Sequence, residues 1–356
     1  MHLQIPSVSL LTAAGPGYLD AAFKAHGSSA AGLIAKIKAN APNSKAIEGV
    51  RYLLGMPNLV LNTAEPLVNE YYSKVNIVST VPSFADKLED ENAEFYNSVT
   101  KSFEFVGPLL GENQVSMGSA LSEQDRADLF KRVEDAIAAN QKIVYVSMGT
   151  VVTGDSVEHG WNGTSGSAIT GKQLCHSVYR AVFEELGSSV CNPVLTPPPL
   201  VIVSVGLQPD AVIDIAVPDN ALCLKGVPQV DLLRAAKPFL FVSNGGQNSF
   251  MEAMSVGIPL LICPGFGDQV TNAAKVHNLG LGLKVDRPAK VDGSATGVAE
   301  VVAMYQAQVS EKIREALGPS HSALAAKAQS VAAELEQAGG VNKAVEVVLK
   351  VAGVIA

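Results

Sequence analysis

Short apolar runs alternate with amphipathic stretches along most of the chain. The runs are rich in Val, Ile and Leu, and the stretches between them have the length and periodicity of helices. This alternation is the pattern of a parallel sheet with helices packed on it, so it predicts an α/β protein. The predicted strands are 7–11, 59–61, 143–147, 200–205, 221–224, 239–242 and 258–262. The predicted helices are 19–39, 122–139, 172–186, 247–255 and 269–277, followed by a helical tail from Val298.

A break in this pattern divides the chain into two parts. A turn-like segment precedes the polar, charged stretch 119–128, and a fresh strand begins only after the next helix. The expected organisation is a first domain at 1–118, a linker and helix at 119–140, a second domain at 141–340 and a C-terminal helix at 341–356.

Residues 154–171, here called the insert, separate the predicted strand 143–147 from the predicted helix 172–186. The insert is rich in Gly, Ser and Thr and carries the only tryptophan of the chain, Trp161. This composition is typical of a loop that runs over the surface. We therefore expect the insert to be a surface loop.

Composition narrows the classes of function. The 356 residues, 47% of them hydrophobic, can bury a large core in two domains or one large α/β unit. A net charge of −8 without a Lys/Arg cluster argues against a nucleic-acid partner. The four cysteines lie far apart, which favours reduced, buried thiols over disulfides or a zinc site. Without a signal-like N-terminus or an apolar run of roughly 18 residues, a cytoplasmic protein with no transmembrane segment is expected.

Polar residues concentrate in an otherwise apolar stretch, 239–269. A predicted strand leads into SNGG at 243–246 and then directly into a helix. Glycines let backbone N–H groups approach a ligand and a helix N-terminus is partly positive, so this turn suits a diphosphate. Glu252 follows about one helical turn later, where a carboxylate can accept hydrogen bonds from a ribose diol, and Asp268 with Gln269 begins a second helix beside the same sheet edge. By spacing alone, an ordinary strand-to-helix turn with capping residues is an equally good interpretation.

Ordered motifs across this region resemble the donor-binding signature of the UDP-glycosyltransferase family. The motifs are VPQVDLL at 227–233, FVSNGGQNS at 241–249, Glu252, GIP at 257–259, Pro264, Asp268-Gln269 and Asn272-Ala273. IVYVSMGT at 143–150 resembles the opening of the family's second domain, and FVGPLL at 105–110 resembles the segment before its linker. The resemblance extends over about residues 5–285 and implies the α/β fold named GT-B. That fold has two Rossmann-like domains with parallel sheets, the first binding the acceptor and the second the nucleotide sugar.

The resemblance also implies roles for the matching residues. A hydroxyl of Ser147 or Thr150 would approach the phosphates, and the backbone of Val227 would meet the base edge. Gln229 and Glu252 would bind the ribose. The turn and helix start at Asn244, Gly245, Gly246, Asn248 and Ser249 would hold the diphosphate, and Asp268 with Gln269 would bind the donor sugar. The family pattern implies no metal, and no cofactor other than the nucleotide sugar as co-substrate.

Two positions depart from the family pattern. Asn244 stands where the family usually has a histidine, and Asn can donate a hydrogen bond to phosphate but never carries positive charge. Gly226 stands where many members stack an aromatic ring on the base. Loss of such a stack costs on the order of 1–3 kcal/mol in other systems, so a nucleoside diphosphate-sugar is better supported than UDP in particular.

The catalytic base is not identified. In the family it is a histidine just after the first strand of the N-terminal domain, whereas residues 5–11 resemble a later strand of that domain. The N-terminal domain is therefore expected to be incomplete. His2 precedes any strand, and His26 has the position of a helix C-terminal cation. His159 in the insert could reach the cleft, although a solvated loop residue is the better interpretation. His176, His277 and His321 are expected to be helix-surface residues without partners.

Three functions remain to be weighed. The first is a glycosyltransferase that moves a sugar from a nucleotide sugar, expected to be a UDP-sugar, to the hydroxyl of a small-molecule acceptor with inversion. The second is a nucleotide-sugar-binding subunit or pseudoenzyme whose acceptor half comes from a partner chain; an unpaired strand edge near residues 5–11 would favour such a partner or self-association. A nicotinamide oxidoreductase is disfavoured, because no G-x-G-x-x-G motif follows an early strand. The identity of the acceptor does not follow from the sequence.

Overall fold

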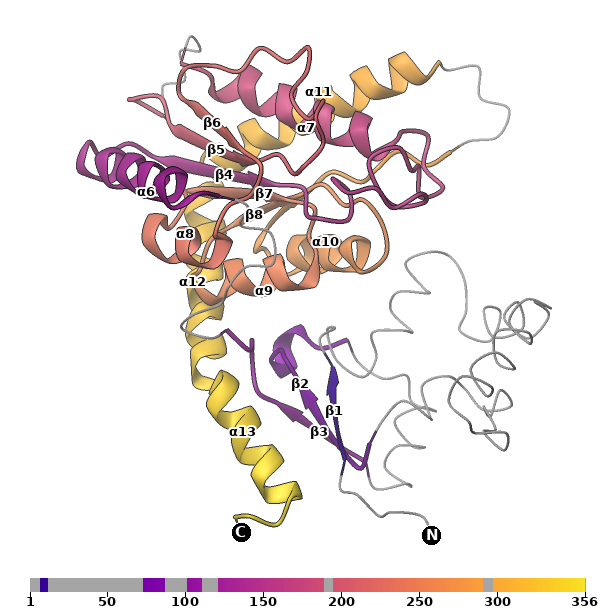
Figure 1. The fold of residues 1–356 in the computed structure, drawn as a ribbon, viewed down its shortest axis with the longest axis vertical. Coiled ribbons are helices and arrows are strands. Elements are labelled where there is room, and N and C mark those ends of the chain that lie inside the picture. Colours follow the sequence, from indigo (N-terminus) through magenta and orange to yellow (C-terminus); the bar gives the residue numbers. More distant parts are fainter. Residues whose placement is uncertain are drawn as a thin grey trace, which may run out of the picture. The chain divides into compact units, whose positions relative to one another are not determined.

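The computed structural model describes residues 7–11, 73–86, 101–110, 121–188, 195–290 and 297–355. The chain forms two compact units. Unit 1 comprises Met1–Leu109 and Ala338–Ala356, and unit 2 comprises Leu110–Gln337. Both contain a parallel sheet (Figure 1). The predicted strand 59–61 and the predicted helix 19–39 lie outside the described residues.

Unit 1 contains a parallel sheet in the order β1-β2-β3. Its described elements are β1 (Val8–Leu11), β2 (Val75–Val78), the short 3₁₀ helix η1 (Pro82–Phe84), β3 (Ser102–Phe105) and α13 (Gly340–Val351). The C-terminal helix α13 packs on β2, where Val347 joins Ile77 and Val106 in a small core. The Gly340 N–H also donates to the Val106 carbonyl at 2.6 Å. The C-terminal helix therefore belongs to the same unit as the N-terminal strand β1.

The strand predicted at 7–11 is confirmed as β1, but β2 and β3 were not predicted. Their sequences, VNIV and SFEF, interrupt the apolar run with a polar residue. In β2 that residue is Asn76, which is fully buried and donates through Nδ2 to the carbonyls of Ser73 and Ser102, both at 2.9 Å. A polar residue can occupy a buried strand position when its amide is hydrogen-bonded. The strand was missed because the sequence pattern expects an apolar residue at that position.

Unit 2 is a six-stranded parallel sheet in the order β6-β5-β4-β7-β8-β9. Its strands are β4 (Ile143–Ser147), β5 (Leu200–Ser204), β6 (Ala221–Leu224), β7 (Leu240–Ser243), β8 (Leu260–Ile262) and β9 (Gly282–Lys284). Its helices are α6 (Glu123–Ala138), α7 (Gly171–Leu186), α8 (Gln229–Ala236), α9 (Gln247–Ser255), α10 (Asp268–Asn278), α11 (Val298–Leu317) and α12 (His321–Gln337). Figure 1 shows α7 and α11 on one face of this sheet and α8, α9 and α10 on the other.

The central strands are buried on both faces, which explains their unbroken apolar sequences. All five residues of β4 are buried, and its neighbours β5 and β7 contribute further Val, Ile, Leu and Phe side chains to the core. Every strand predicted in this unit is confirmed within two residues, whereas the short elements α8 and β9 were not predicted. Among the described helices, none combines the length and apolarity that a membrane span requires.

The insert connects β4 to α7 as expected, but it is not simply a surface loop. Trp161 is 2% exposed and Ile169 is fully buried, and both belong to the main core of unit 2. The insert ends in a capping box: Thr170 Oγ1 accepts the Gln173 N–H, and Gln173 Oε1 accepts the Thr170 N–H. The expectation of a surface loop was wrong because a few apolar residues anchor a segment whose composition is mostly small and polar.

The cysteines that the structure describes are free, as expected for structural thiols. Cys175 and Cys263 are buried and Cys223 is partly buried, whereas Cys191 lies outside the described residues. Burial raises the pKa of Cys175 and of Cys263 to about 12 and that of Cys223 to about 11. These three thiols therefore stay protonated and unreactive at neutral pH.

Candidate functional site

The strand order of unit 2 creates a switch point between β4 and β7. From β4 the chain first continues to β5 and β6 on one side and then returns to β7, β8 and β9 on the other. Ligands of open α/β sheets bind at such a point, beyond the carboxyl ends of the strands. The last residues of the two strands, Ser147 and Ser243, are register partners, and the Asn244 N–H donates to the Ser147 carbonyl at 3.3 Å. The topology alone thus directs a ligand to the two loops that follow β4 and β7.

These two loops touch through Gly149 and Asn244. Gly149 has φ = 73°, and a Cβ atom there would lie 2.5 Å from Asn244 Nδ2. Only glycine leaves room for the Asn244 amide, which is 4% exposed. Asn244 Oδ1 accepts the Gly246 N–H at 3.4 Å. The side chain that stands in place of the family's usual histidine therefore sits at the switch point.

Helix α9 begins without a side-chain cap. Its N-cap residue is Gly246, which has no side chain to accept the first-turn N–H groups. Asp268 Oδ2 accepts one of these, the Gln247 N–H, at 3.2 Å. Within the described residues, the N–H groups of Asn248 and Ser249 have no acceptor. Free first-turn donors at the positive end of a helix dipole form an anion site.

Three elements bring a polar network together beside this helix end. Gln229, the first residue of α8, donates from Nε2 to Ser249 Oγ at 3.0 Å and to Glu252 Oε2 at 2.6 Å. Its Oε1 accepts the hydroxyl hydrogen of Tyr145, in the middle of β4, at 3.0 Å. The bonds to Glu252 use Oε2 alone, so Oε1 has no hydrogen-bond donor among the described residues. The network therefore holds one carboxylate oxygen in place for a further donor.

Two carboxyl groups at this edge are partly desolvated. Burial raises the pKa of Glu252 and outweighs the hydrogen bond from Gln229, which lowers it. Burial also raises the pKa of Asp268 and outweighs the backbone N–H groups around it, including that of Gln247. Neither carboxylate has a cationic partner within the described residues. Hydroxyl donors from a ligand would relieve such desolvated charges.

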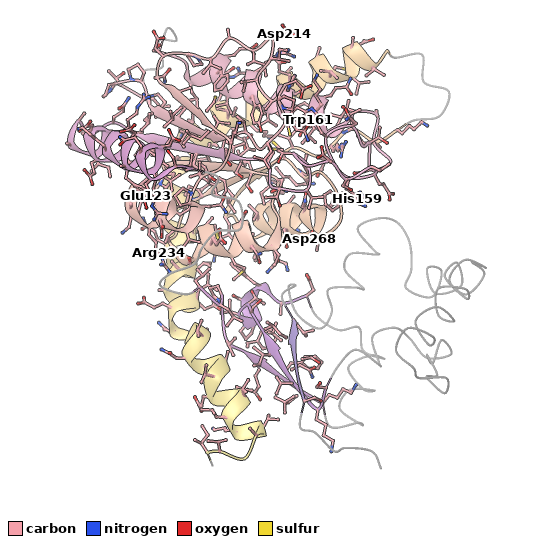
Figure 2. The ribbon with its side chains drawn as sticks, in the orientation of Figure 1. Glu123, His159, Trp161, Asp214, Arg234 and Asp268 are labelled. Atoms are coloured by element: carbon pink, nitrogen blue, oxygen red, sulfur yellow. The ribbon has the colours of Figure 1, made fainter. Side chains whose placement is uncertain are left out.

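The loop after β8 is held by the side chain of Gln269. Gln269 Oε1 accepts the Gly265 N–H at 2.7 Å and the Phe266 N–H at 3.3 Å, and the residue is 4% exposed. Its carbonyl oxygen is therefore committed to the protein, and only its amide nitrogen remains for a ligand. Asp268 opens α10 one residue earlier (Figure 2).

The remaining predicted site residues lie at the same edge without entering the network. Ser147 is buried at the end of β4, and Thr150 is exposed in the turn that follows. Val227 is buried just before α8. Asn248 is exposed on the first turn of α9, and Gly245 is buried with φ = 78°. The structure thus places the whole predicted donor set around the carboxyl ends of the strands.

Sequence reasoning missed Tyr145 and Arg287. Tyr145 had a usable signal, because a tyrosine inside a fully buried strand needs a hydrogen-bond partner for its hydroxyl. Arg287 had none: it follows β9, and its guanidinium donates to the backbone carbonyls of Gly163, Ile169 and Gly265. Contacts with backbone carbonyls of two distant segments cannot be predicted from residue type.

Two histidines contradict the expectation of unpartnered surface residues. His176 is 7% exposed, its Nε2 lies 3.2 Å from the Asp210 carbonyl, and its ring meets Trp161 edge-on. His321 Nε2 lies 2.8 Å from the Phe239 carbonyl, and its ring stacks on Phe239. Burial lowers the pKa of both histidines. Both are structural residues packed at helix starts or faces, which helical spacing alone does not distinguish from surface positions.

The other histidines that the structure describes, His159 and His277, do not hydrogen-bond with the network either. His277 is exposed on α10. His159 is partly exposed, and its ring stacks on Phe266 with 4.4 Å between ring centroids. His2 and His26 lie outside the described residues. Within the described residues, no histidine hydrogen-bonds with Gln229, Ser249 or Glu252.

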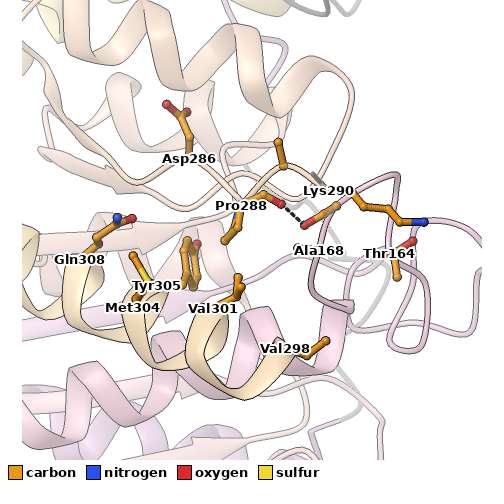
Figure 3. A pocket seen from close by; sticks show the side chains of 12 residues that line it. Thr164, Ala168, Asp286, Pro288, Lys290, Val298, Val301, Met304, Tyr305 and Gln308 are labelled. Atoms are coloured by element: carbon orange, nitrogen blue, oxygen red, sulfur yellow. Dashed lines mark hydrogen bonds between the residues drawn. The ribbon is translucent and has the colours of Figure 1, made fainter. Parts of the chain in front are cut away.

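A cavity of about 560 Å³ lies elsewhere in unit 2 (Figure 3). Its walls are the second half of the insert, residues 286–290 and the exposed face of α11. The hydrogen bond from Ser167 Oγ to the Pro288 carbonyl, 2.6 Å long, closes one side. None of the predicted donor residues lines this cavity. The candidate donor site is therefore identified from the sheet topology and the hydrogen-bond network, and it is separate from this cavity.

Comparison with known proteins finds similarity to glycosyltransferases. Residues 206–303 match the family model described as UDP-glucoronosyl and UDP-glucosyl transferase. The chain is 34% identical over 131 residues to the NDP-glycosyltransferase YjiC of Bacillus subtilis, which covers 35% of this chain and 32% of that protein. It is 36% identical over 109 residues to the putative UDP-glucuronosyltransferase ugt-60 of Caenorhabditis elegans, covering 31% of this chain and 19% of the relative. The chain thus matches about a third or less of the length of these relatives.

Solved structures show the fold. The glycosyltransferase of kitacinnamycin covers 98% of this chain and 70% of its own, with a TM-score of 0.59 and 17% identity. The calicheamicin glycosyltransferase CalG4 gives a TM-score of 0.54, also at 17% identity, and covers 99% of this chain and 70% of its own. The expected α/β fold, GT-B with Rossmann-like units, is confirmed. The region that matches the UDP-glucoronosyl and UDP-glucosyl transferase model, residues 206–303, includes Gln229, Glu252 and Asp268.

Proposed function

We propose that unit 2 binds a nucleoside diphosphate-sugar and that the protein transfers the sugar to an acceptor hydroxyl with inversion. The observation that carries this proposal is the network of Tyr145, Gln229, Ser249 and Glu252 beside the uncapped start of α9. This arrangement combines an anion site with Glu252 Oε1, a carboxylate oxygen that can accept a hydrogen bond from a ligand hydroxyl. The description of the family model and the name of the relative ugt-60 favour UDP as the nucleotide, whereas the name of YjiC leaves the nucleotide open.

In this proposal the diphosphate lies against the first turn of α9. The N–H groups of Asn248 and Ser249 and the Asn244 amide donate to its oxygens. A ribose hydroxyl donates to Glu252 Oε1, and the base lies near the backbone of Val227. The sugar hydroxyls meet Asp268 and the amide nitrogen of Gln269. A hydroxyl of Ser147 or Thr150 closes the phosphate site from the side of β4.

Transfer follows from this arrangement. The oxygen of the acceptor hydroxyl attacks the anomeric carbon of the sugar from the face opposite the diphosphate, which inverts that carbon. The bond from the anomeric carbon to the phosphate oxygen breaks, and the diphosphate leaves with the electron pair. Fixed N–H donors and the helix dipole stabilise the charge that develops on the leaving oxygen. A base must take the hydroxyl proton, and no described histidine is placed in the network to do so.

The test is product formation by the full chain. The protein is incubated with UDP-glucose and a panel of phenolic and alcoholic acceptors, and glycosides are detected by mass spectrometry. Proton NMR of the product gives the anomeric configuration, which should be β from the α-configured donor. Glu252→Ala should abolish most of the product, whereas Glu336→Ala, on the exposed surface of α12, should not. No product with any acceptor, or a product of retained configuration, would contradict transfer with inversion.

A second function is a nucleotide-sugar-binding subunit whose acceptor half and base come from a partner chain. The observation that favours it is the lack of a histidine in the donor network within the described residues. The same assays distinguish the two proposed functions. A binding subunit binds the nucleotide sugar with an affinity that depends on Glu252 but forms no glycoside until the partner is added.

A further inference from the structure

The insert is fastened to the loop that carries the proposed sugar-binding residues. That loop, residues 264–268, is called the sugar loop here. Arg287 Nη1 donates to the Gly265 carbonyl of the sugar loop at 3.0 Å. Arg287 Nη2 donates to the Gly163 and Ile169 carbonyls of the insert at 3.1 and 2.5 Å. One guanidinium therefore holds two loops that are about a hundred residues apart in the sequence.

Arg287 makes these contacts without a counter-ion. Within the described residues, no carboxylate forms an ion pair with it, and the neighbouring Asp286 pairs with Lys284 instead. Burial lowers the pKa of Arg287. Burying a cation is costly, and the three carbonyl acceptors on the two loops offset part of that cost. The next residue, Pro288, also contacts the insert, because its carbonyl accepts the Ala168 N–H at 3.0 Å.

His159 of the insert contacts the sugar loop directly. Its ring stacks on Phe266, with an interplanar angle of 12°. Ser165 Oγ lies 3.1 Å from its Nδ1, and its Nε2, at the partly exposed edge of the ring, lies 3.7 Å from Oε2 of the exposed Glu158. Phe266 is two residues before Asp268, and its N–H binds Gln269 Oε1. The imidazole thus stacks on the loop residue whose N–H binds Gln269 and that lies two positions before Asp268.

On its other side, the insert is hydrogen-bonded to the loop that follows β5. Trp161 Nε1 donates to Asp210 Oδ1 at 2.9 Å, and Lys172 Nζ donates to Asp210 Oδ2 at 2.6 Å (Figure 2 labels Trp161). Asp210 lies in the loop after β5. Gln208 Nε2, in the same loop, donates to Asp155 Oδ1 at 2.7 Å. The insert is therefore a fixed wall tied to the loops that follow β5, β8 and β9.

We propose that the insert forms one wall of the donor-sugar subsite, in which His159 contacts the sugar and Arg287 is the positioning residue that holds the wall against the sugar loop. This inference rests on the proposed function of unit 2. The ligand class is the hexose part of a nucleotide sugar, whose hydroxyls can both donate to and accept from an imidazole nitrogen. His159 then contributes to the difference in affinity between the nucleotide sugar and the nucleotide alone.

The experiment compares two ligands on each variant of the full chain. Calorimetry gives Kd for UDP and for UDP-glucose, and their ratio reports the contribution of the sugar alone. His159→Ala and Arg287→Met should each weaken UDP-glucose relative to UDP by about three- to tenfold, the size of one or two lost hydrogen bonds. Arg287→Lys should fall between, because a single ammonium cannot span three carbonyls in the guanidinium geometry. A general loss of folding would weaken both ligands together and leave the ratio unchanged.

Matched controls are His277→Ala, on the exposed end of α10, and Arg314→Met on α11, which removes an ion pair with Glu185 of α7. Both should keep the wild-type ratio. A folded His159→Ala protein with the wild-type ratio would overturn the contact with the sugar. A folded Arg287→Met protein with the wild-type ratio would overturn the positioning role. If the wild-type chain binds neither ligand, the proposed function itself fails, and this inference fails with it.

Discussion

Tyr145 donates its hydroxyl hydrogen to Oε1 of Gln229 at 3.0 Å, across 84 positions of sequence. This bond decides which way the Gln229 amide faces. With Oε1 held by the tyrosine, Nε2 must point to Ser249 and Glu252, as observed. A fully buried tyrosine in the central strand therefore orients the ribose side of the proposed donor site.

Tyr145→Phe should lower both stability and nucleotide affinity. The change leaves the Gln229 carbonyl oxygen without its donor and frees the amide to rotate away from Glu252. A cost of about 1–3 kcal/mol in the free energy of unfolding is expected for one unpaired buried polar group. Urea unfolding and UDP calorimetry measure the two effects. Tyr179→Phe is the matched control, because the buried Tyr179 hydroxyl has no hydrogen-bond partner among the described residues. Equal effects of the two changes would show that the Tyr145 hydroxyl does not act through Gln229.

Glu252→Gln should make the protein more stable in a pH-dependent way. Burial raises the pKa of Glu252 in the folded state above its ordinary value of 4.5. Its contribution to stability is therefore fully present below pH 4.5 and is lost as pH rises through the raised folded pKa. The variant does not suffer this loss, so its advantage over the wild type should grow above pH 4.5 and then level off. Urea unfolding from about pH 4 to pH 8 measures the difference. An offset between the two proteins that is constant over this range would contradict a raised pKa.

Gly149→Ala should disturb the contact between the two switch-point loops. The new Cβ would lie 2.5 Å from Asn244 Nδ2, in addition to the strain of a positive φ. Gly280→Ala is the matched control, because Gly280 also has a positive φ, 68°, but nothing within 4 Å of a Cβ. The clash should cost about 1–3 kcal/mol more than the control in thermal or urea unfolding, and UDP affinity should fall only in Gly149→Ala. Equal losses in both variants would mean that the backbone strain alone matters at Gly149.

The sequence was a good guide to unit 2 wherever one segment carries its own signal. The strand 143–147 is unbroken and apolar because it is buried on both faces, and it was predicted to the residue. The start of α9 was also predicted to the residue, because SNGG marks a strand-to-helix turn. Helix α8 was missed because it is only eight residues long, and β9 because it has only three.

What the sequence could not show are contacts that join distant segments. The pairing of Tyr145 with Gln229 links a strand to a helix, and neither residue type specifies the other. The insert looked like a surface loop because its burial depends on partners outside it. Trp161 is held by Asp210, and the backbone of the insert is held by Arg287. Long-range hydrogen bonds of this kind are decided by the fold and not by local pattern.

The central claim is that unit 2 binds a nucleotide sugar through Glu252 at the switch point of its sheet. Calorimetric titration of the full chain with UDP, and with TDP as a second nucleotide, tests it most directly. The wild type and Glu336→Ala, an exposed change on α12, should bind at least one of the two nucleotides with the same Kd. Glu252→Ala should bind it about 10- to 100-fold more weakly, because the ribose hydroxyls lose their acceptor. A wild-type chain that binds neither nucleotide, or a folded Glu252→Ala protein that binds as tightly as the wild type, would contradict the account.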